Sequence, residues 1–385
     1  MTKKTTRNQQ YSDIRPTLFM AFELGMSEWK LGFTIGLGQK ARRRTVTAGN
    51  LEKVQREIVA AKKRFQLPET AEVVSCYEAG RDGFWLHRYL TQSGIVNLVV
   101  DSASIEVNRR KRRAKTDRLD VEKLLTMLIR YQYGEHRVWS VVRVPSPEEE
   151  DNRQLNRELR SLKKEKTRTT NRIKGLLASQ GVRLEPGKEL SDKKLDSIRL
   201  WDGSPLQPGL KGRLQHECAH VVFLKRQILS LEGDRRRELR EGENPDLDQV
   251  RQLASLRGIG VNGGWVLVRE FFAWRKFNNR REVGSLAGLA PTPYQSGESR
   301  REQGISKAGN RHVRGVMIEL AWSWVRFQPE SKLTRWFEER FGGAGKRVRR
   351  VGIVALARRL LIDMWKFLET GALPEGAQLK KVVVA

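Results

Sequence analysis

The chain has 385 residues, enough for about two or three domains with hydrophobic cores of their own. It carries 74 Lys and Arg residues against 45 Asp and Glu residues, which gives a formal net charge of +29. A positive charge of this size indicates a nucleic-acid partner, because clustered cations gain affinity by releasing the counterions of phosphates.

The N-terminal segment and the two cysteines indicate a protein of the cell interior. Residues 1–15 are polar, lack the apolar segment of a signal peptide and are expected to be flexible. A membrane surface is the alternative partner, but the sequence has no apolar span long enough to cross a bilayer. Cys76 and Cys218 match no metal-binding spacing, so reduced thiols are expected. We therefore expect a cytoplasmic, nucleoid-associated protein with no membrane partner.

Residues 16–144 show the alternation of strands and helices that is typical of an α/β domain. Segments with strand character are 17–25, 28–36, 71–80 and 95–102. Segments with helix character are 46–65, 82–94 and 116–134. One apolar face of the first helix is predicted to contain Leu51, Val54, Ile58, Val59 and Ala61. This order predicts a mixed sheet with flanking helices.

Four acidic side chains stand out in this domain because of where they lie. Glu23 and Glu78 are in strand segments, and Asp117 and Asp120 are in the first turn of the last helix, with Thr116 as a plausible N-cap. Acids repel DNA unless a cation lies between them and the phosphate. Mg²⁺ takes carboxylate, water and phosphate oxygens as ligands. The four acids therefore predict a site for Mg²⁺ (or Mn²⁺) beside a phosphodiester.

The spacing of Asp117 and Asp120 supports this prediction. The two acids are three residues apart and share one helix face, which continues with Leu124 and Leu128 and should pack on the sheet. The alternative is that acids in a first turn only complement the helix dipole. The acid at the end of a strand, Glu78, favours the metal site.

A run of cations comes directly before this helix. It contains Arg109, Arg110, Lys111, Arg112, Arg113 and Lys115. Such a run is usually a solvated loop. Its place before the acid pair favours a role in holding the phosphate backbone near the metal.

Residues 145–245 predict two long helices with narrow apolar seams. The seam of the first contains Leu155, Leu159, Leu162, Thr169, Ile173 and Leu176. The seam of the second contains Leu214, Val221, Leu224, Ile228 and Leu231. The spacing predicts an antiparallel coiled-coil hairpin that offers a dimer interface, and its basic outer faces could touch nucleic acid.

Residues 246–371 read as helical with one Gly- and Ser-rich interruption, followed by a loose tail at 372–385. The first part resembles a helix-hairpin-helix element, in which the backbone amides around Gly258 and Gly260 could meet a phosphate; the alternative is an ordinary tight turn. Two later helices are expected to bury one side each. Their apolar residues are Val313, Val316, Met317, Leu320 and Trp324 in the first, and Val354, Leu361, Met364, Trp365 and Leu368 in the second.

The interruption carries a second candidate for chemistry. Ser296 is followed by Gly297, and Ser306 is followed by Lys307. Cations near these serines are Arg300, Arg301, Lys307, Arg311 and Arg314. A serine nucleophile needs an accessible backbone and cations that stabilise the displaced phosphate. Most loop serines have no chemical role, so composition alone leaves Ser296 an ordinary loop residue.

Three long segments, in this order, carry a resemblance to a known family: CYEAGRDGFWLHRYL, AKTDRLDVEKLL and SLAGLAPTPYQSGESRREQGISKAGNRHVRGVMIELAW. Together they resemble the DEDD-type insertion-sequence transposases related to the Piv invertase, a family of bridge-RNA-guided serine recombinases. The resemblance covers most of the chain. It implies an α/β plus α architecture: an RNase H-like (RuvC-like) domain at 16–144, a coiled-coil hairpin at 145–245 and a mostly α-helical transposase domain at 246–371.

The resemblance also implies the chemistry. The metal site would be Glu23, Glu78, Asp117 and Asp120, and Ser296 in the SG motif would become covalently linked to DNA. Ser306 is the nearest alternative nucleophile. The family commonly has Asp on its first strand, where this chain offers Glu23; Asp101 and Asp82 are further candidates.

The implied function is RNA-guided DNA recombination by an insertion-sequence transposase. Its partners would be donor and target DNA, a structured bridge RNA and other copies of the chain in a homodimer or homotetramer. A metal-dependent RuvC-like nuclease or junction resolvase, with Ser296 only structural, is one alternative. The other is a non-catalytic nucleic-acid scaffold in which the acids offset local charge.

Overall fold

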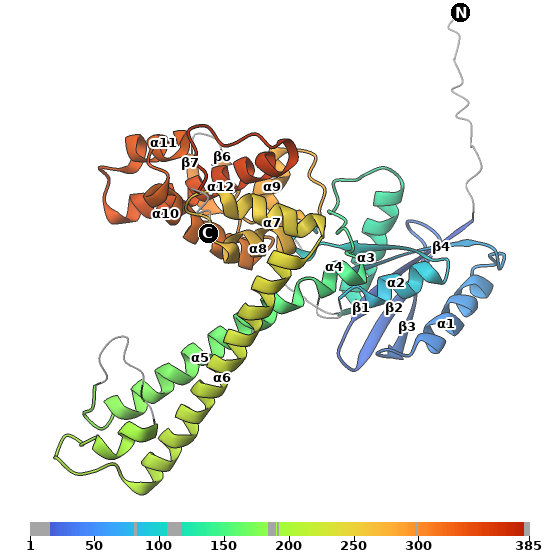
Figure 1. Cartoon of the computed structure of the whole chain (residues 1–385). Helices are drawn as coiled ribbons and strands as arrows, with labels where there is room; N and C mark the ends of the chain where they lie inside the picture. The colour runs from blue at the N-terminus through green and yellow to red at the C-terminus, as the bar shows by residue number, and fades with distance from the viewer. Residues whose placement is uncertain are drawn as a thin grey trace, which may run out of the picture. The chain divides into compact units, whose positions relative to one another are not determined.

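The computed structural model of the chain describes residues 16–80, 83–105, 117–183, 190, 192–296 and 299–380. At residues 103, 117–119, 192–193, 293–296 and 299–303 it describes the backbone alone. The chain forms two compact units, Met1–Pro145 and Ser146–Ala385, which we call unit 1 and unit 2 (Figure 1). The helical hairpin and the C-terminal helical region, predicted as separate domains, both fall within unit 2.

Unit 1 is built on a mixed sheet, as the sequence predicts, and the sheet has five strands. Its strands are β1 (Thr17–Leu24), β2 (Glu28–Thr34), β3 (Arg42–Thr47), β4 (Glu72–Glu78) and β5 (Val96–Val100). The order across the sheet is β3-β2-β1-β4-β5. Strands β1, β4 and β5 are parallel to one another, and β2 is antiparallel to both of its neighbours. The edge strand β3 was not predicted, because Val46 is its only buried residue.

Helices cover both faces of this sheet. Helices α1 (Leu51–Arg64) and α2 (Trp85–Gln92) pack on the face that carries Leu18 and Phe22 of β1. Helix α3 (Asp117–Gln132) packs on the other face, which carries Phe19 and Ala21 of β1. The alternation of side chains along a strand assigns successive residues to opposite faces.

The structure confirms one predicted helix face of unit 1 and corrects the other. In α3, Leu124 and Leu128 are buried against the sheet, so the predicted stripe is confirmed. In α1, Val54, Ile58 and Ala61 are buried, but Val59 is 64% exposed, so its place on the apolar face was wrong. Ile58 points into the core, and Val59, as the next residue, points about 100° away from it around the helix axis.

A glycine lets α3 approach the sheet closely. A Cβ atom on Gly32 of β2 would collide with the side chains of Val121 and Leu125. The helix therefore rests on the backbone of β2 rather than on a side chain. This close packing fixes the helix that carries Asp117 and Asp120.

Unit 2 begins with short helix α4 (Pro147–Asp151), followed by two long helices, α5 (Gln154–Ala178) and α6 (Pro208–Glu241). The long helices are antiparallel neighbours, because Lys163 contacts Glu232 at 2.6 Å and Arg172 contacts Glu217 at 2.8 Å (Figure 1). A 3-10 turn at Asp192–Ser197 packs against α6 in the connection between them.

The predicted seams of the two long helices are present with changes at some positions. Buried as predicted are Leu159, Thr169, Ile173, Leu214, Val221, Leu224 and Ile228. Only partly buried are Leu155, Leu162, Leu176 and Leu231. The buried positions that the seams missed are Asn156, Leu177, Cys218 and Arg235. At its first turn α5 also contacts a helix that follows α6, because Arg157 bonds with Glu270 of η4.

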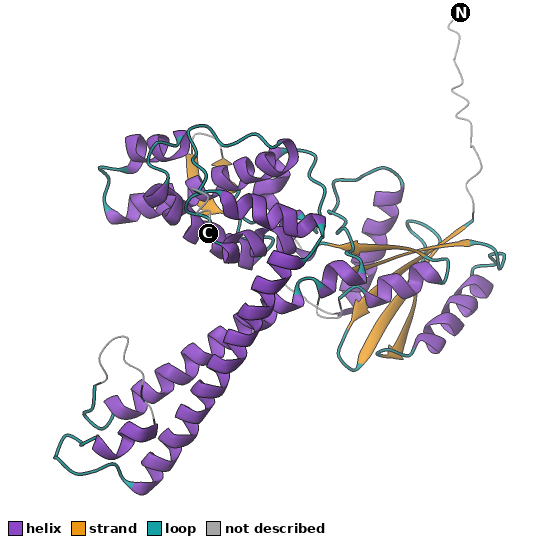
Figure 2. Cartoon of the chain, in the orientation of Figure 1, coloured by secondary structure: helices purple, strands orange, loops and turns teal. Residues whose placement is uncertain are grey.

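The rest of unit 2 is a bundle of helices around one core, as Figure 2 shows in purple. Its members are α7 (Pro245–Ser255), α8 (Val261–Leu267), η4 (Val268–Phe272), α9 (Arg280–Leu286), α10 (Arg311–Phe327), α11 (Lys332–Phe341) and α12 (Lys346–Thr370). The predicted face of α10 is buried at all five positions. In α12, Leu361 and Met364 are buried, whereas Val354, Trp365 and Leu368 are only partly covered. The buried face of this helix runs instead through Ile353, Leu356, Leu360 and Phe367.

Two expectations for this part of the chain were wrong. The Gly- and Ser-rich interruption is not only a loop: it contains an antiparallel hairpin of β6 (Pro291–Ser296) and β7 (Ser299–Ile305). The tail is not loose over 372–380, because Gln378 bonds with Gln328 and Arg257 on the bundle, and Leu379 pairs with Leu256. These hydrogen bonds hold the tail segment on the bundle, although its polar sequence gives little sign of such contacts.

Of the helices in the described part of the chain, none combines the length and apolar character needed to pass through a membrane.

Candidate functional site

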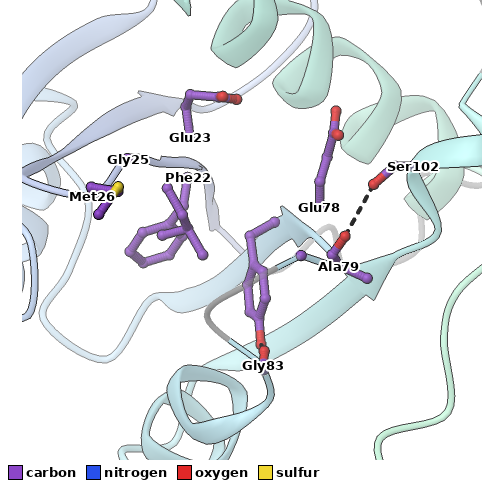
Figure 3. Close-up of a pocket in the computed structure, with 11 residues that line it drawn as sticks. Phe22, Glu23, Gly25, Met26, Glu78, Ala79, Gly83 and Ser102 are labelled. Atoms are coloured by element: carbon purple, nitrogen blue, oxygen red, sulfur yellow. Dashed lines mark hydrogen bonds between the residues drawn. The ribbon is translucent and has the colours of Figure 1, made fainter. Parts of the chain in front are cut away.

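A pocket of about 490 Å³ lies at the carboxyl ends of the parallel strands β1 and β4 (Figure 3). We call it the acidic pocket; it is lined by residues 22–26, 77–80, 83 and 102. Glu23 and Glu78 both line it. The β1–β4 register pairs Phe22 with Tyr77, so Glu23 and Glu78 are the next two residues along these neighbouring strands. The fold thus brings two of the four predicted acids side by side.

The two glutamates share one face of the sheet. Glu23 is in phase with Ala21 on β1, and Glu78 is in phase with Cys76 on β4; both of these residues are buried under α3. Figure 3 shows Glu23 and Glu78 projecting to one side of the sheet while Phe22 projects to the other. The period of two along a strand explains this arrangement. Both carboxylates therefore lie on the face that α3 covers.

Helix α3 carries the other two predicted acids over this face. The carbonyl oxygen of Leu124 lies 3.9 Å from the Cys76 sulfur, and half-buried Asp120 is one turn before Leu124. Asp117 is the first residue of α3, and its side chain lies outside the described part. Among the side chains that the structure describes, no three His, Cys, Asp or Glu residues are grouped closely enough to hold one metal ion. The described part of the chain therefore offers at most two such ligands to one ion.

Other residues around the acidic pocket limit its chemistry. Burial raises the pKa of the Cys76 thiol far above its usual range, and the Glu78 carboxylate adds to the shift, so Cys76 is not a nucleophile. Lys30 lies opposite Glu23 in the β1–β2 register and supplies local positive charge. The Ser102 hydroxyl donates to the Ala79 carbonyl at 3.1 Å at the rim.

Residues near the pocket that were ranked lower, or missed, have distinct positions. Asp101 follows β5, and its backbone N–H donates to Ser140. Asp82 lies outside the described residues. Ser102 and Met26 line the pocket and were not predicted; their only signal was that each lies two residues after the end of a strand.

The candidate nucleophile lies at the end of a strand. Ser296 is the last residue of β6 and pairs with Ser299 of β7, and its side chain is outside the described part. Ser306 lies at the other end of the hairpin, where its N–H donates to the Ala290 carbonyl at 2.8 Å. The two serines are thus at opposite ends of β7. Of their predicted neighbours, Arg300 and Arg301 pair with Gln295 and Tyr294 in the register.

The predicted glycine turn joins α7 to α8. Gly258 has a positive φ of 82°, which favours glycine, and its carbonyl accepts a hydrogen bond of 2.7 Å from the Ser323 hydroxyl of α10. Gly260 is the N-cap of α8 and is exposed. The turn is therefore anchored to α10, which gives Gly258 a packing role whatever else it does.

The remaining predicted cations divide into exposed and anchored groups. Lys307 and Arg311 are exposed, whereas Arg314 donates from Nη1 to the Lys307 carbonyl at 3.0 Å. The cation run at 109–115 lies outside the described residues.

Comparison with known proteins assigns the family. Residues 250–334 match the model described as Transposase IS116/IS110/IS902 family. The chain is 40% identical over 375 residues to a putative transposase of Sinorhizobium fredii, covering 94% of each chain. The chain belongs to this transposase family. It is also 24% identical over 213 residues to the transposase for insertion sequence element IS1328 of Yersinia enterocolitica, covering 55% of this chain and 60% of the relative.

A further relative is the transposase for insertion sequence element IS1111A of Coxiella burnetii, with 27% identity over 165 residues, which covers 43% of this chain and 44% of the relative. The family match at 250–334 includes the glycine turn, the β6–β7 hairpin with Ser296 and all of α10. The match to the Sinorhizobium relative extends across both units. As a transposase the chain is a DNA-processing enzyme, and DNA is its expected partner.

Proposed function

We propose that this transposase moves its insertion sequence by strand transfer through a Ser296–DNA intermediate, assisted by Mg²⁺ or Mn²⁺ at the acidic pocket. One observation carries the metal part: Glu23 and Glu78 lie side by side on neighbouring parallel strands, on the face that α3 covers. Like charges opposite each other destabilise a sheet unless a cation lies between or beside them.

The donor set of the acidic pocket fits a magnesium-type ion. Mg²⁺ is commonly bound by one or two carboxylates, with waters and substrate phosphate oxygens as its other ligands. Glu23 and Glu78 would hold it. Asp120 of α3 would join them only after moving closer, because no three described ligand side chains are grouped around one point in this structure, and Asp117 is the fourth candidate. When bound, the ion would polarise a phosphodiester oxygen and neutralise developing charge. Lys30 offers the competing explanation, in which the cation of the pair is a side chain.

Ser296 is proposed as the nucleophile because it ends β6, beside the two residues 297 and 298 that connect it to β7. Its Oγ would form a bond to phosphorus while the bond from phosphorus to one DNA oxygen breaks. The serine proton would leave to a base and finally reach the departing DNA hydroxyl. The phosphoserine link conserves the energy of the broken bond for joining to a second strand.

The fold proposal is an RNase H-like, RuvC-like domain for residues 16–144. Its support is the strand order β3-β2-β1-β4-β5, with β2 alone reversed, and acids at the ends of the two central strands. The helices α5 and α6 are proposed as a coiled-coil hairpin that joins copies of the chain in a homodimer or homotetramer.

Guide RNA completes the proposal. A bridge RNA would choose the donor and target DNA by base pairing, while the protein holds backbone and shape. The net charge of +29 suits contacts with more than one nucleic-acid strand. The protein would act in the cytoplasm at the nucleoid. Sequencing RNA that copurifies with the protein tests this: one discrete species, needed for recombination, is expected, and activity without it would remove the guided mechanism.

The serine step is tested by trapping the protein–DNA adduct on a denaturing gel. Wild type, Ser306→Ala and Ser299→Ala should form the adduct, and Ser296→Ala should not. Ser299 is the matched control, since it pairs with Ser296 across the hairpin. If Ser296→Ala still nicks DNA at the wild-type rate, the alternative metal-dependent nuclease or resolvase is correct.

A further inference from the structure

A second cavity, of about 450 Å³, lies within unit 2 between α5, α8 and α10, which are labelled in Figure 1. We call it the Arg160 cavity; the lining residues that matter here are Asn156, Arg160, Lys163, Arg311, His312 and Gly315. The first three recur along α5 at spacings of four and three residues, so they share one face of that helix. Arg311, His312 and Gly315 come from the first turns of α10.

Positive charge dominates this cavity. Glu319 is its one acidic lining residue, against three cations. Lys163 is paired with Glu232 at 2.6 Å. The side chains of Arg160 and Arg311 form no hydrogen bond or salt bridge with any residue that the structure describes. By contrast, Arg157 lies three residues earlier on α5 and donates hydrogen bonds to both carboxylate oxygens of Glu270.

A buried donor in the wall also lacks an acceptor. Asn156 is 3% exposed, and its Nδ2 has no hydrogen-bond partner in the described part of the protein. Burying a polar group without a hydrogen-bond partner costs folding free energy, so the position of Asn156 calls for an explanation. An oxyanion in the adjoining cavity would provide acceptor oxygens on this side of α5.

Two further observations describe the space itself. A Cβ atom on Gly315 would meet no atom within 4 Å, so the α10 wall is open at this residue. Burial and the charge of Arg160 together lower the pKa of His312, which shows that cations crowd this side of α10. A cavity with free volume and an excess of guanidinium groups suits an anion with several oxygens.

We propose that the Arg160 cavity binds a phosphodiester group of DNA, held by the guanidinium groups of Arg160 and Arg311. Arg157 shows the alternative fate of an arginine on this helix, since an internal carboxylate satisfies it. The inference rests on the family assignment, and it needs neither the serine intermediate nor the metal ion of the proposed function.

The test measures binding of the full-length protein to a fluorescein-labelled DNA duplex by anisotropy, across a series of KCl concentrations. EDTA is present, so the readout is independent of strand transfer. Arg160→Gln should weaken binding roughly tenfold and lower the slope of log affinity against log salt by about 1, since it removes one phosphate contact. Gly315→Leu adds a side chain at a position where a Cβ atom meets no described atom within 4 Å, and by filling the cavity it should weaken binding comparably.

Matched controls separate a site from general charge. Arg168→Gln removes a cation of α5 that is already paired with Glu165, and Gly175→Leu adds a side chain at an open glycine of the same helix. Neither should change affinity by more than about twofold, because an exposed paired charge contributes little. Thermal melting verifies that each variant folds; Arg311→Gln replaces any that does not.

Several outcomes would overturn the proposal. Equal losses for Arg160→Gln and Arg168→Gln would indicate general charge only. Wild-type binding by Gly315→Leu would show that the cavity is not used. An effect on RNA of the same sequence but not on the duplex would assign the cavity to RNA. Stabilisation by inorganic phosphate, lost in Gly315→Leu while duplex binding persists, would identify a free-phosphate site.

Discussion

The acidic pocket of unit 1 gathers negatively charged side chains, and the Arg160 cavity of unit 2 gathers positively charged ones. In the first, two glutamates on neighbouring strands face the same space; in the second, two arginines on different helices do. Elsewhere in unit 2, charges pair within the chain, as in the contact of Arg269 with Asp246 at 2.8 Å. The comparison teaches that ion pairs inside the chain support the fold, whereas like charges gathered at a cavity indicate a partner from outside.

The largest effect is expected from a substitution in the acidic pocket. Glu78→Gln removes one carboxylate with almost no change of shape, and strand transfer should fall by about 100-fold or more, because the stabilisation of developing charge is lost. Assays of strand transfer at fixed Mg²⁺ measure it. Glu72→Gln, at the exposed start of the same strand, is the control and should keep full activity. Full activity in Glu78→Gln would remove the metal site.

The second prediction concerns a charge that is paired internally. Arg157→Gln leaves the Glu270 carboxylate, 4% exposed, without its bidentate partner. The free energy of unfolding of unit 2 should fall by roughly 2–3 kcal/mol, less than for a fully buried pair because Arg157 is half-exposed. Urea denaturation measures it, with Arg168→Gln as the paired but exposed control. An unchanged midpoint would mean that such pairs do not support the fold.

The third prediction tests how α3 is positioned over the acids. Gly32→Ala forces a Cβ atom into Val121 and Leu125, and unit 1 should lose about 1–2 kcal/mol of stability. Gly36→Ala is the control, since a Cβ atom there meets nothing within 4 Å. Chemical denaturation of both variants gives the comparison. Equal stability would show that α3 shifts freely on the sheet.

The smallest expected effect is a pH dependence of stability that arises from His312 in the Arg160 cavity. The pKa of His312 is lowered in the folded protein, so the unfolded chain binds its proton more readily and stability falls as the pH drops below the unfolded value. The charged groups that face it are Arg157, Arg160, Glu270, Lys163, Arg311 and Glu319.

The measurement compares unfolding of wild type and His312→Gln between about pH 8 and about pH 5. Wild type should lose more stability on acidification, by at most about 1.4 kcal/mol per pH unit for one group. Burial raises the pKa of Asp246 and of Asp363, which acts in the opposite direction but equally in both proteins. Parallel curves would exclude His312 as the source.

Much of unit 1 could be predicted because its pattern is local. Strands such as β4 are apolar runs that end in a single acid, and the spacing of Asp120, Leu124 and Leu128 gives the buried side of α3. The neighbouring positions of Glu23 and Glu78, by contrast, depend on the pairing of β1 with β4, which are separated by two strands and a helix. Spacing identifies the acids but does not show that they are neighbours.

Unit 2 was harder to predict for two physical reasons. The hairpin of β6 and β7 is rich in proline, glycine and arginine, and it belongs to a two-stranded sheet without the alternation of a buried strand. The Arg160 cavity is assembled from three helices far apart in sequence, so no local period marks Arg160 or His312. Buried Asn156 stands in an apolar seam where the pattern leads one to expect leucine.

The segment that follows α12 has a consequence for handling this protein. Gln328 is 1% exposed, and its side-chain amide donates to the Gln378 carbonyl at 2.8 Å while its oxygen accepts from the Gln378 N–H. A shortened version ending with the last helix would leave this carboxamide in the interior with half its partners removed. Expression designs that trim the C-terminus for crystallisation should therefore stop no earlier than Lys380.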